Sequence, residues 1–323
     1  MDRRAFLCGL TLGALAAPIT AEAQPARTPR IGYLGNGNPP AMSSDLPFNR
    51  GLRELGWIEG QNVTTEYRWA KGNLDRLPIL AAELVRANVD VIVTAGPQGL
   101  NAARESTNTI PIVFVYLADP VVAGFVRSLA RPNGNMTGIS SEFEKLITKQ
   151  LQFLKEAVPR LSRLAILRHR DSSRAVLEAA ETAARSLDLT AGILTVNEVG
   201  EFENAFRTAR NEHAGAVAVL PGPYFDTHRR RLIDLAARYR LPAIYEFRDY
   251  VNDGGLMSYA PSIEDMFRQL ASYVDRILKG TRPGDLPVEQ ASKFELVINL
   301  KTAKALGLTI PQSVLLRADQ VID

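Results

Sequence analysis

The strongest constraint on the fold is a strand-and-helix pattern that the sequence repeats in two series. Short runs rich in β-branched residues, such as Val89–Ala95, alternate with segments of helical periodicity. A short apolar strand followed by a helix is typical of a parallel sheet covered on both faces. The first series predicts strands at Arg30–Gly35, Val63–Trp69, Val89–Ala95 and Ile110–Leu117, and helices at Leu46–Leu55, Leu74–Ala87, Gln98–Ser106 and Val121–Ala130.

The second series begins after the turn cluster Asn133-Gly134-Asn135, with an amphipathic helix at Glu142–Val158. Two doubly wound lobes of similar size explain this repetition more simply than one sheet of about ten strands. The series predicts strands at Leu164–Arg168, Ala191–Val196, Ala216–Leu220 and Ala243–Phe247, and helices at Arg174–Leu187, Glu203–Glu212 and Thr227–Tyr239.

The remaining segment, Ser262–Asp323, is too short for a third domain, and it contains a predicted helix at Ile263–Leu278 and a strand at Phe294–Leu300. We therefore expect an α/β fold with two parallel-sheet lobes joined by hinge strands, which is a clamshell able to close on a ligand. The expected divisions are residues 24–138 for lobe 1, 139–250 for lobe 2, and 251–323 for a return to lobe 1 with a C-terminal tail. The hinge crossings are expected near Met136–Ser141, Asp249–Ala260 and Pro287–Phe294.

The N-terminus predicts export. Arg3-Arg4 precede an apolar run from Ala5 to Ala17 and the small-x-small site Ala21-Glu22-Ala23, so residues 1–23 are typical of a signal peptide cleaved after Ala23. The apolar run is shorter than the roughly 20 residues that a spanning helix needs. The paired arginines leave Sec and twin-arginine export both open. Cys8, the one cysteine of the sequence, lies in this segment, so the predicted mature chain has no thiol and no disulfide.

The residues for enzymatic chemistry are missing. The three histidines form no His-Glu-x-x-His motif, and neither a Gly-x-Ser-x-Gly elbow nor a Gly-x-x-x-x-Gly-Lys-Ser/Thr loop occurs. A net charge of +3 spread along the chain is no nucleic-acid footprint, and the run Arg229–Arg231 is explained by a solvated helix face. We therefore expect a protein that is not an enzyme, with no metal, no cofactor and no nucleic-acid partner.

Candidate ligand contacts follow from the rule that ligands bind at the carboxyl ends of parallel strands. In lobe 1, Gly96-Pro97-Gln98 is either a plain turn or an anion site at a helix N-terminus. Asp119 before Pro120 is either a helix N-cap or the partner of a ligand ammonium. The lobe 1 candidates are Asn36, Asn38, Gly96, Pro97, Gln98, Tyr116 and Asp119.

In lobe 2, aromatic residues either wall the pocket or pack within the lobe. Glu246 ends an apolar strand, where an unpaired carboxylate is uncommon. His169 and Arg170 either add positive potential to the cleft or lie on the surface. The candidates here are His169, Arg170, Ser172, Ser173, Pro221, Tyr224, Tyr245 and Glu246, with Tyr259 near the second crossing.

The order and spacing of several segments resemble the ABC-transporter substrate-binding family that includes tryptophan- and phenylalanine-binding lipoproteins. The resembling segments are Arg30–Leu34, Asp75–Pro78, Ala81–Leu84, Ile110–Phe114, Asp119–Val121, Arg131–Gly138, Gly254–Tyr259, Ile277–Gly280, Phe294–Asn299 and Ala303–Leu308. The resemblance implies a type I periplasmic-binding fold and a separately encoded permease and ATPase. The loop His169–Ser173 departs from the Asn-Pro type turn common in the family, which would suit a more acidic ligand.

The expected function is to bind a small molecule, an amino acid or related carboxylate, in the periplasm and to deliver it to a membrane permease. The ligand would stabilise the closed state by contacting both lobes. A ligand-sensing partner of a membrane receptor uses the same physics and stays open as an alternative. A transcriptional regulator is disfavoured, because it would carry a DNA-binding headpiece in place of the signal peptide. An exported enzyme is disfavoured, because this chain lacks a recognisable set of catalytic residues.

Overall fold

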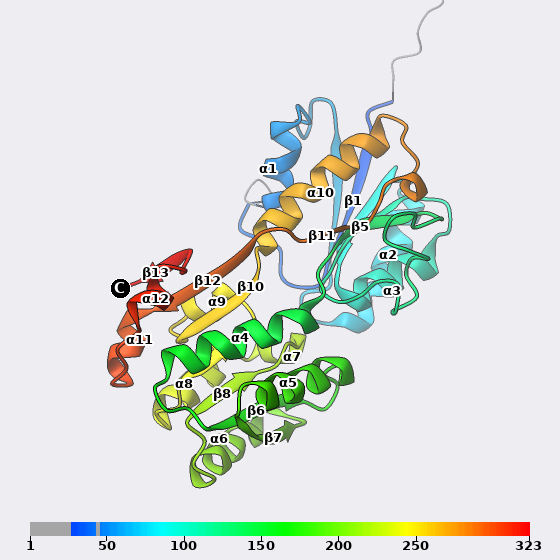
Figure 1. Ribbon diagram of the computed structural model, residues 1–323. Helices are drawn as coiled ribbons and strands as arrows, with labels where there is room; N and C mark the ends of the chain where they lie inside the picture. The colour runs from blue at the N-terminus through cyan, green and yellow to red at the C-terminus, as the bar shows by residue number, and fades with distance from the viewer. Residues whose placement is uncertain (1–26, 43–45) are drawn as a thin grey trace, which may run out of the picture.

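The computed structural model describes residues 27–42 and 46–323, which form two α/β lobes (Figure 1). The expected signal peptide, residues 1–23, lies outside the described residues. Each lobe contains one sheet with helices on both of its faces. The predicted fold class, two doubly wound α/β lobes joined by crossing segments, is therefore confirmed.

The first lobe is built on a sheet that has, within the described residues, six parallel strands in the order β11-β5-β4-β3-β1-β2. They are β1 (Arg30–Gly35), β2 (Thr64–Trp69), β3 (Val91–Ala95), β4 (Ile112–Tyr116), β5 (Met136–Ser140) and β11 (Glu289–Gln290). The helices of this lobe are α1 (Pro47–Glu54), α2 (Leu77–Arg86), α3 (Gly96–Ser106) and α10 (Ile263–Leu278), with 3-10 helices at Leu74–Arg76 and Pro283–Asp285.

The alternation of side chains explains why helices cover both faces of this sheet. In β3, Val91 and Val93 belong to the core that also contains residues of α1 and α10, whereas Ile92 belongs to the core shared with α2 and α3. Successive side chains of a strand point to opposite faces, so a strand that is apolar throughout must be covered on both.

The second lobe is built on a sheet of seven strands among the described residues, in the order β13-β12-β10-β9-β8-β6-β7. They are β6 (Arg163–His169), β7 (Thr190–Val196), β8 (Ala216–Val219), β9 (Ala243–Tyr245), β10 (Met257–Pro261), β12 (Phe294–Asn299) and β13 (Gln320–Ile322). The helices are α4 (Phe143–Ala157), α5 (Arg174–Ser186), α6 (Phe202–Asn211), α7 (Pro223–Thr227), α8 (Arg229–Arg238), α9 (Arg248–Asn252), α11 (Leu300–Ala305) and α12 (Gln312–Leu315), with a 3-10 helix at Val199–Glu201. The pairing of β10 with β12 is antiparallel.

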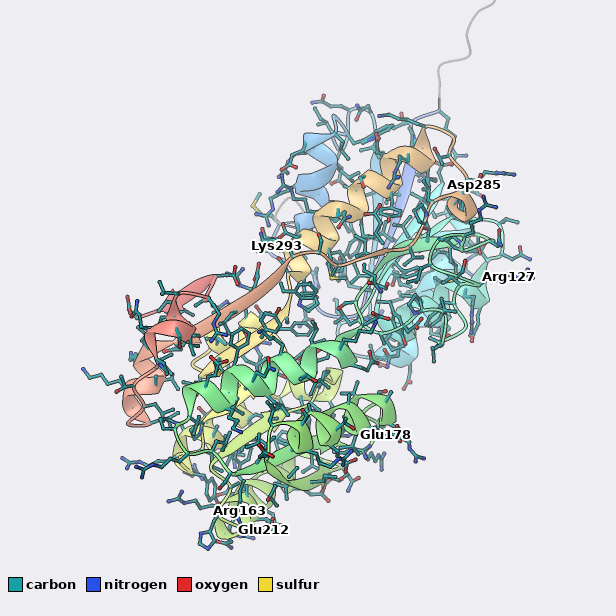
Figure 2. The ribbon with its side chains drawn as sticks, viewed as in Figure 1. Arg127, Arg163, Glu178, Glu212, Asp285 and Lys293 are labelled. Carbon is teal, nitrogen blue, oxygen red and sulfur yellow. The ribbon has the colours of Figure 1, made fainter. Side chains whose placement is uncertain are left out.

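The described chain passes between the lobes three times, after β5, after β10 and after β11. The last two crossings are joined to each other: the Ser262 N–H donates to the Lys293 carbonyl oxygen at 3.0 Å. Lys293 Nζ lies 2.6 Å from Asp265 Oδ2 in the first turn of α10. Figure 2 labels Lys293 where the ribbon runs from one lobe to the other. The second crossing lies at Ser262, two residues beyond the segment expected from the sequence.

The segment after residue 250, expected to return to the first lobe, divides between both lobes. α10 packs against α1, and β11 pairs with β5, so residues 263–290 do return. β10, β12 and β13 instead extend the second sheet, where Met257 pairs with Ile244 and Ile298. The expected assignment of residues 251–323 to the first lobe is therefore corrected, because β10, β12 and β13 belong to the second. An apolar strand joins the sheet that offers it an open edge, and the tertiary fold decides which edge is open.

A second correction concerns Val121–Ala130, for which the sequence predicts a helix and the structure has a series of turns. Gly124 has φ +73° there, and the Phe125 N–H donates back to the Pro120 carbonyl oxygen at 2.9 Å. A left-handed residue four positions into the segment ends any helix that begins at Pro120. The apolar periodicity instead places Phe125 and Val126 in the core beside α2 and α3.

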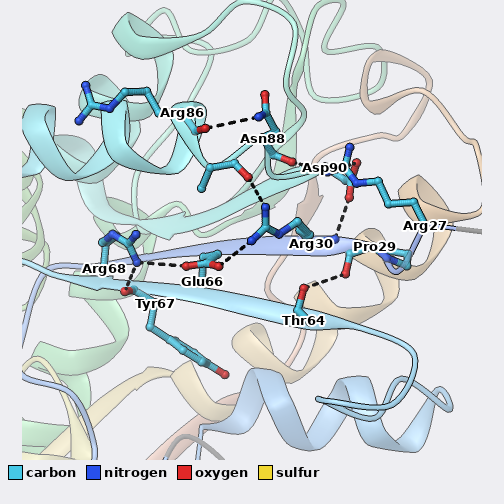
Figure 3. A network of polar contacts seen from close by, with 11 residues as sticks. Arg27, Pro29, Arg30, Thr64, Glu66, Tyr67, Arg68, Arg86, Asn88 and Asp90 are labelled. Atoms are coloured by element: carbon cyan, nitrogen blue, oxygen red, sulfur yellow. Dashed lines mark hydrogen bonds and ion pairs between the residues drawn. The ribbon is translucent and has the colours of Figure 1, made fainter.

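A polar network occupies the starting edge of the first sheet (Figure 3). The Arg30 side chain donates to the Ala87 carbonyl oxygen at 2.7 Å and pairs with Glu66 at 3.1 Å, while the Arg30 N–H donates to Asp90 Oδ2 at 2.7 Å. Arg68 continues the network to Glu66 and to Glu83 of α2. These contacts tie β1, β2 and the loop before β3 together, so this edge of the lobe is used for structure.

Candidate functional site

The polar residues singled out in the sequence gather at the carboxyl ends of the strands in both sheets. The loops after β1, β3 and β4 carry the first set, and the loops after β6, β8 and β9 carry the second. α7, which follows β8, lies on the side of the second lobe nearest the first (Figure 1). Carboxyl ends of parallel strands with helix N-termini behind them form the usual ligand edge of such sheets. We call these two groups of loops the first and second ligand edges.

On the first ligand edge, Asn36 joins the ends of two neighbouring strands. Its Nδ2 donates to the Ala95 carbonyl oxygen at 3.0 Å, and its buried Oδ1 has no hydrogen-bond partner among the described residues. Gly96 has φ +72°, and a Cβ there would lie 3.3 Å from Asn36 Nδ2, so glycine permits this close approach. Pro97 and Gln98 are exposed at the start of α3. Asn36 and the N-terminus of α3 are therefore brought together.

Asn38 is exposed two residues further along this edge. It has no hydrogen bond with another described residue, and the structure leaves it outside the Asn36 contact.

Asp119 acts as a cap in the structure. Its Oδ1 accepts from the Val121 N–H at 2.7 Å and from the Val122 N–H at 3.2 Å. Nearby, the half-buried Tyr116 ring meets Phe125 edge-on at 5.2 Å. Burial, together with the charges of Glu144 and Asp119, raises the pKa of Tyr116.

Glu144 is a residue of this edge that sequence analysis missed. It lies in the first turn of α4, just after the first crossing. Burial raises the pKa of Glu144, and the charges of Asp119 and Glu142 raise it further, whereas a backbone hydrogen bond lowers it. In the sequence, Glu144 looks like one more polar position of an amphipathic helix, and nothing there indicates that it lies near Asp119.

On the second ligand edge, His169 and Tyr224 form a stacked pair. Their ring centroids are 4.5 Å apart with an interplanar angle of 24°. His169 Nδ1 accepts from the Asp171 N–H at 3.3 Å, and Nε2 lies 3.2 Å from the Asn197 carbonyl oxygen. These contacts suit the tautomer with its hydrogen on Nε2. Because they hold the edge of the buried ring, its flat face stays turned toward Tyr224.

The other residues of the His169 loop are arranged around that ring. Ser172 Oγ accepts from the His169 N–H at 3.2 Å and therefore shapes the loop. Arg170 is exposed, 3.7 Å from the Asp171 carboxylate, and Ser173 is exposed before α5 with no capping bond from its side chain. Pro221 is half-buried directly after β8. Among these, the exposed Arg170 guanidinium is the cation that a ligand carboxylate could reach.

Glu246 is buried, with 7% of its surface exposed. Its Oε2 accepts from the Gly222 N–H at 3.2 Å. Burial raises the pKa of Glu246 well above its ordinary value, and the neighbouring Asp226 charge raises it further. Asp226, which sequence analysis missed, accepts a hydrogen bond from the Tyr250 hydroxyl at 3.0 Å. Asp226 and Tyr250 lie 24 positions apart in the sequence, so only the fold brings them together.

Two candidate tyrosines pack against other aromatic rings. Tyr245 is 1% exposed and stacks on Tyr250 at 4.9 Å, because β9 ends at residue 245 and directs this ring into the core shared with α6 and α8. Tyr259 packs between Phe153, at 5.1 Å, and Phe294, at 6.1 Å. The Tyr245 ring is too deeply buried to reach a ligand, which corrects its assignment as a ligand contact, whereas the half-buried Tyr259 ring near the second crossing stays a predicted contact.

Two further searches of the described residues bear on function. Within that part of the chain, no group of three or more histidine, cysteine, aspartate or glutamate side chains could hold a metal ion. None of the helices formed by the described residues is both long and apolar enough to cross a membrane.

Comparisons with known proteins identify a family and a relative that this chain resembles. A sequence profile of the ABC transporter substrate binding protein family matches residues 42–322. The chain is 24% identical over 269 residues to a tyrosine-binding protein of Clostridioides difficile (strain R20291), an alignment that covers 81% of this chain and 75% of that protein.

Two solved structures superpose on the chain with a TM-score of 0.81 each, covering 91% of this chain and 100% of theirs. One is a conserved domain protein from Vibrio cholerae, 27% identical to this chain. The other is an ABC domain from Streptococcus pneumonia in complex with L-Trp, 26% identical.

Proposed function

The chain belongs to the ABC transporter substrate-binding protein family, as the resemblance noted in the sequence implied, and from this we propose which solute it takes and where. Members of this family bind a substrate rather than convert it, so the chain is a binding protein and not an enzyme. We propose that it captures an amino acid or a related carboxylate between the two ligand edges. It then delivers this solute to a membrane permease that is driven by a separate ATPase.

The observation that supports the proposal is that polar residues gather at the carboxyl ends of the strands in both lobes. One edge offers the N-terminus of α3 beside Asn36, where free N–H groups favour a carboxylate. The other offers the flat His169 and Tyr224 pair beside the exposed Arg170. A ligand that contacts both edges favours the closed arrangement by its differential contacts alone.

An aromatic amino acid is our first choice of ligand. Of the relatives named above, one is a tyrosine-binding protein and another was solved in complex with L-Trp. In this chain the ring pair His169 and Tyr224 offers a flat surface of the kind that stacks on another ring. The competing choice, an acidic ligand, is favoured by Arg170 at the same loop, and both belong in one screen.

We further propose that the protein works in the periplasm, after export and removal of residues 1–23. This proposal depends on the sequence pattern of the N-terminus together with the family, whose members deliver solutes to membrane transporters. Mass spectrometry of the protein recovered from a periplasmic extract would give its first residue. A mature chain starting at Gln24 is expected, and full-length protein retained in the cytoplasm would contradict it.

The test of the binding function is a thermal-shift screen of the protein, confirmed by calorimetry. The probes are L-tyrosine, L-tryptophan, L-phenylalanine, L-glutamate and L-aspartate, with D-tryptophan as the matched control for stereospecific binding. A solute bound only by the folded state raises the melting temperature with dose. A dose-dependent shift for an aromatic L-amino acid supports our first choice, and a shift for the dicarboxylates alone replaces it with the acidic ligand. Calorimetry showing no heat of binding for any of the five would overturn the proposed ligand class.

A further inference from the structure

Beneath the second ligand edge lies a cluster of buried carboxyl groups. Glu246 directly follows β9, and Asp226 lies in α7, which carries Tyr224. Neither carboxylate has an ion-pair contact with another described residue. Arg229 directs its Nε to Asp253 Oδ2 at 2.8 Å, and its Nη1 donates to the main-chain carbonyl oxygen of Asp226 at 3.4 Å. A half-buried acid and a buried acid thus lie near each other, and neither carboxylate forms an ion pair with a described residue.

We propose that the carboxyl groups of Asp226 and Glu246, when neutral, act as a pair that positions the loop segment Pro221–His228, which contains α7 and Tyr224, at the second ligand edge. The inference rests on the proposed function in one respect, namely that Tyr224 faces the ligand. It assigns Glu246 a different role from the one expected from the sequence, because the carboxyl group positions the loop and does not hold the ligand.

The hydrogen bonds of the pair show how it would position the loop. Glu246 Oε2 accepts from the Gly222 N–H, which holds the start of the loop to the end of β9. Asp226 Oδ1 accepts from the Tyr250 hydroxyl, which holds the middle of the loop to α9. Between these two points, the buried Phe225 ring packs edge-on to Phe202, 5.7 Å away. Tyr224 is therefore held in the loop between two fastened residues.

The surroundings of the pair favour its protonated form. The pKa of Asp226 is raised to about 6: burial raises it most, the Tyr250 hydrogen bond and the Arg229 charge lower it in part, and the Asp249 charge raises it. Tyr245 and Tyr250 are neutral, because burial raises the pKa of each well above 10. Like charges so close in a buried site cannot both ionise at low cost.

The direction of the pH effect follows from these shifts. Both acids have a higher pKa in the folded protein than in the unfolded chain, so the folded state binds protons more tightly. Their contribution to stability is fully present below about pH 4 and is lost as the pH rises through the folded values, near 6 for Asp226. When both acids ionise, the loop must open to hydrate them, and Tyr224 leaves its place beside His169.

The first test measures thermal unfolding of the ligand-free protein between pH 5 and pH 8. The expected result is that the melting temperature of the wild type falls over this range more than that of Glu246→Gln, whose neutral amide can still accept from the Gly222 N–H. Glu178→Gln is the matched control, because Glu178 is an exposed residue of α5 paired with Arg174 (Figure 2). Parallel profiles for the wild type and Glu246→Gln would overturn the proposal.

The second test measures whether a rise in pH opens the segment 222–228 itself. Hydrogen exchange of the amides in 222–228 is followed at pH 6 and pH 8 and corrected for the intrinsic rate. We expect opening of this loop to become roughly tenfold or more frequent in the wild type, since each unit of pH above a shifted pKa is a factor of ten. Asp226→Asn, which keeps an acceptor for Tyr250, should remove most of that increase. A loop whose corrected exchange is the same at both pH values contradicts the proposal.

A third measurement uses only the wild-type protein, so it does not require that any variant folds. The side-chain carboxyl carbons of the wild type are titrated by NMR. Signals assigned to Asp226 and Glu246 that both titrate above their ordinary range support the pair, whereas ordinary titration of these two groups would overturn it; Glu144, whose pKa is also raised, is assigned separately. None of the three measurements uses a ligand. Failure of the pair is therefore distinguishable from failure of the binding function, which the solute screen tests.

Discussion

The Tyr224 ring contacts two histidines: it stacks on His169 at 4.5 Å and meets the tilted ring of His228 at 4.8 Å. Such an arrangement fixes the ring before any ligand arrives, so little side-chain freedom is lost on binding. We therefore regard Tyr224 as the side chain of the second ligand edge that contributes most to affinity.

Replacing Tyr224 by alanine should weaken binding of the best aromatic solute by roughly tenfold, which corresponds to about 1.4 kcal/mol and agrees with the usual contribution of a ring contact. Tyr224→Phe should keep most of the affinity. The measurement is calorimetric titration. Tyr239→Ala is the matched control, because that ring packs against Phe206 at 6.4 Å, away from both ligand edges. Equal losses for the two alanine variants would show that the effect is not local.

Gly138 illustrates a position where the backbone itself decides the residue. It has φ +156°, and a Cβ there would lie 2.1 Å from the Phe114 carbonyl oxygen of the neighbouring strand. We expect Gly138→Ala to lower the free energy of unfolding by about 3 kcal/mol, from strain and overpacking together. Urea denaturation measures this. Gly37→Ala, with nothing within 4 Å of the added Cβ, should stay within about 0.5 kcal/mol of the wild type.

Among the helices, α10 is the one that returns the chain to the first lobe, and its packing against α1 is close. Gly51 of α1 lies against the Arg268 carbonyl oxygen, which a Cβ would approach to 2.5 Å. Beyond α1, Trp57 Nε1 donates to the buried Asp275 carboxylate at 2.9 Å. Apolar packing and one specific hydrogen bond together fasten α10 to a part of the chain more than 200 residues earlier.

The Trp57 hydrogen bond gives a prediction for this helix pair. Trp57→Phe keeps an aromatic ring but removes the donor, which leaves Asp275 with Lys279 as its other partner. The expected loss in the free energy of unfolding is about 1 to 2 kcal/mol. Trp69→Phe is the control for the smaller ring, because the half-buried Trp69 side chain donates no hydrogen bond to a described residue. If Trp57→Phe lowers the free energy of unfolding no more than Trp69→Phe does, the hydrogen bond does not contribute to stability.

At the level of the whole molecule, two lobes joined by short crossings can change their relative orientation without disturbing either core. The crossings are linked by the Ser262 to Lys293 backbone bond and by the ion pair of Lys293 with Asp265. The cores of each lobe lie on the faces of its own sheet. If the proposed function holds, a ligand held between the edges acts on the angle between the two lobes.

We expect saturating L-tryptophan or L-tyrosine, whichever binds, to reduce the radius of gyration of the protein in solution. Small-angle X-ray scattering at matched protein concentration measures this. The Tyr224→Ala variant at the same ligand concentration should show a smaller fraction of the compact form. An unchanged radius with a calorimetrically saturated site would mean that binding does not close the lobes.

Much of the fold was predictable from the sequence, because it depends on local periodicity. Helix α10 begins and ends at the predicted residues, Ile263 and Leu278, since its apolar face and its capping Ser262 lie in one continuous segment. The predicted helix at Val121–Ala130 was wrong, because one residue inside the segment interrupts the helix. Its periodicity is real, but Gly124 takes a left-handed conformation that single-residue preferences do not reveal.

The sequence by itself determined the two series of alternating strands and helices and the strand ends where polar residues gather, because each depends on residues close together in the chain. It did not indicate β5, β11 or β13 as strands, and it indicated β10 only as a crossing. The tertiary structure alone decided which sheet β10, β12 and β13 join, since an open edge exists only after folding. It also decided that Tyr245 is buried and that Glu246 lies close enough to Asp226 to be affected by its charge. Burial and charge proximity depend on residues from different elements, and no local pattern records where those elements meet.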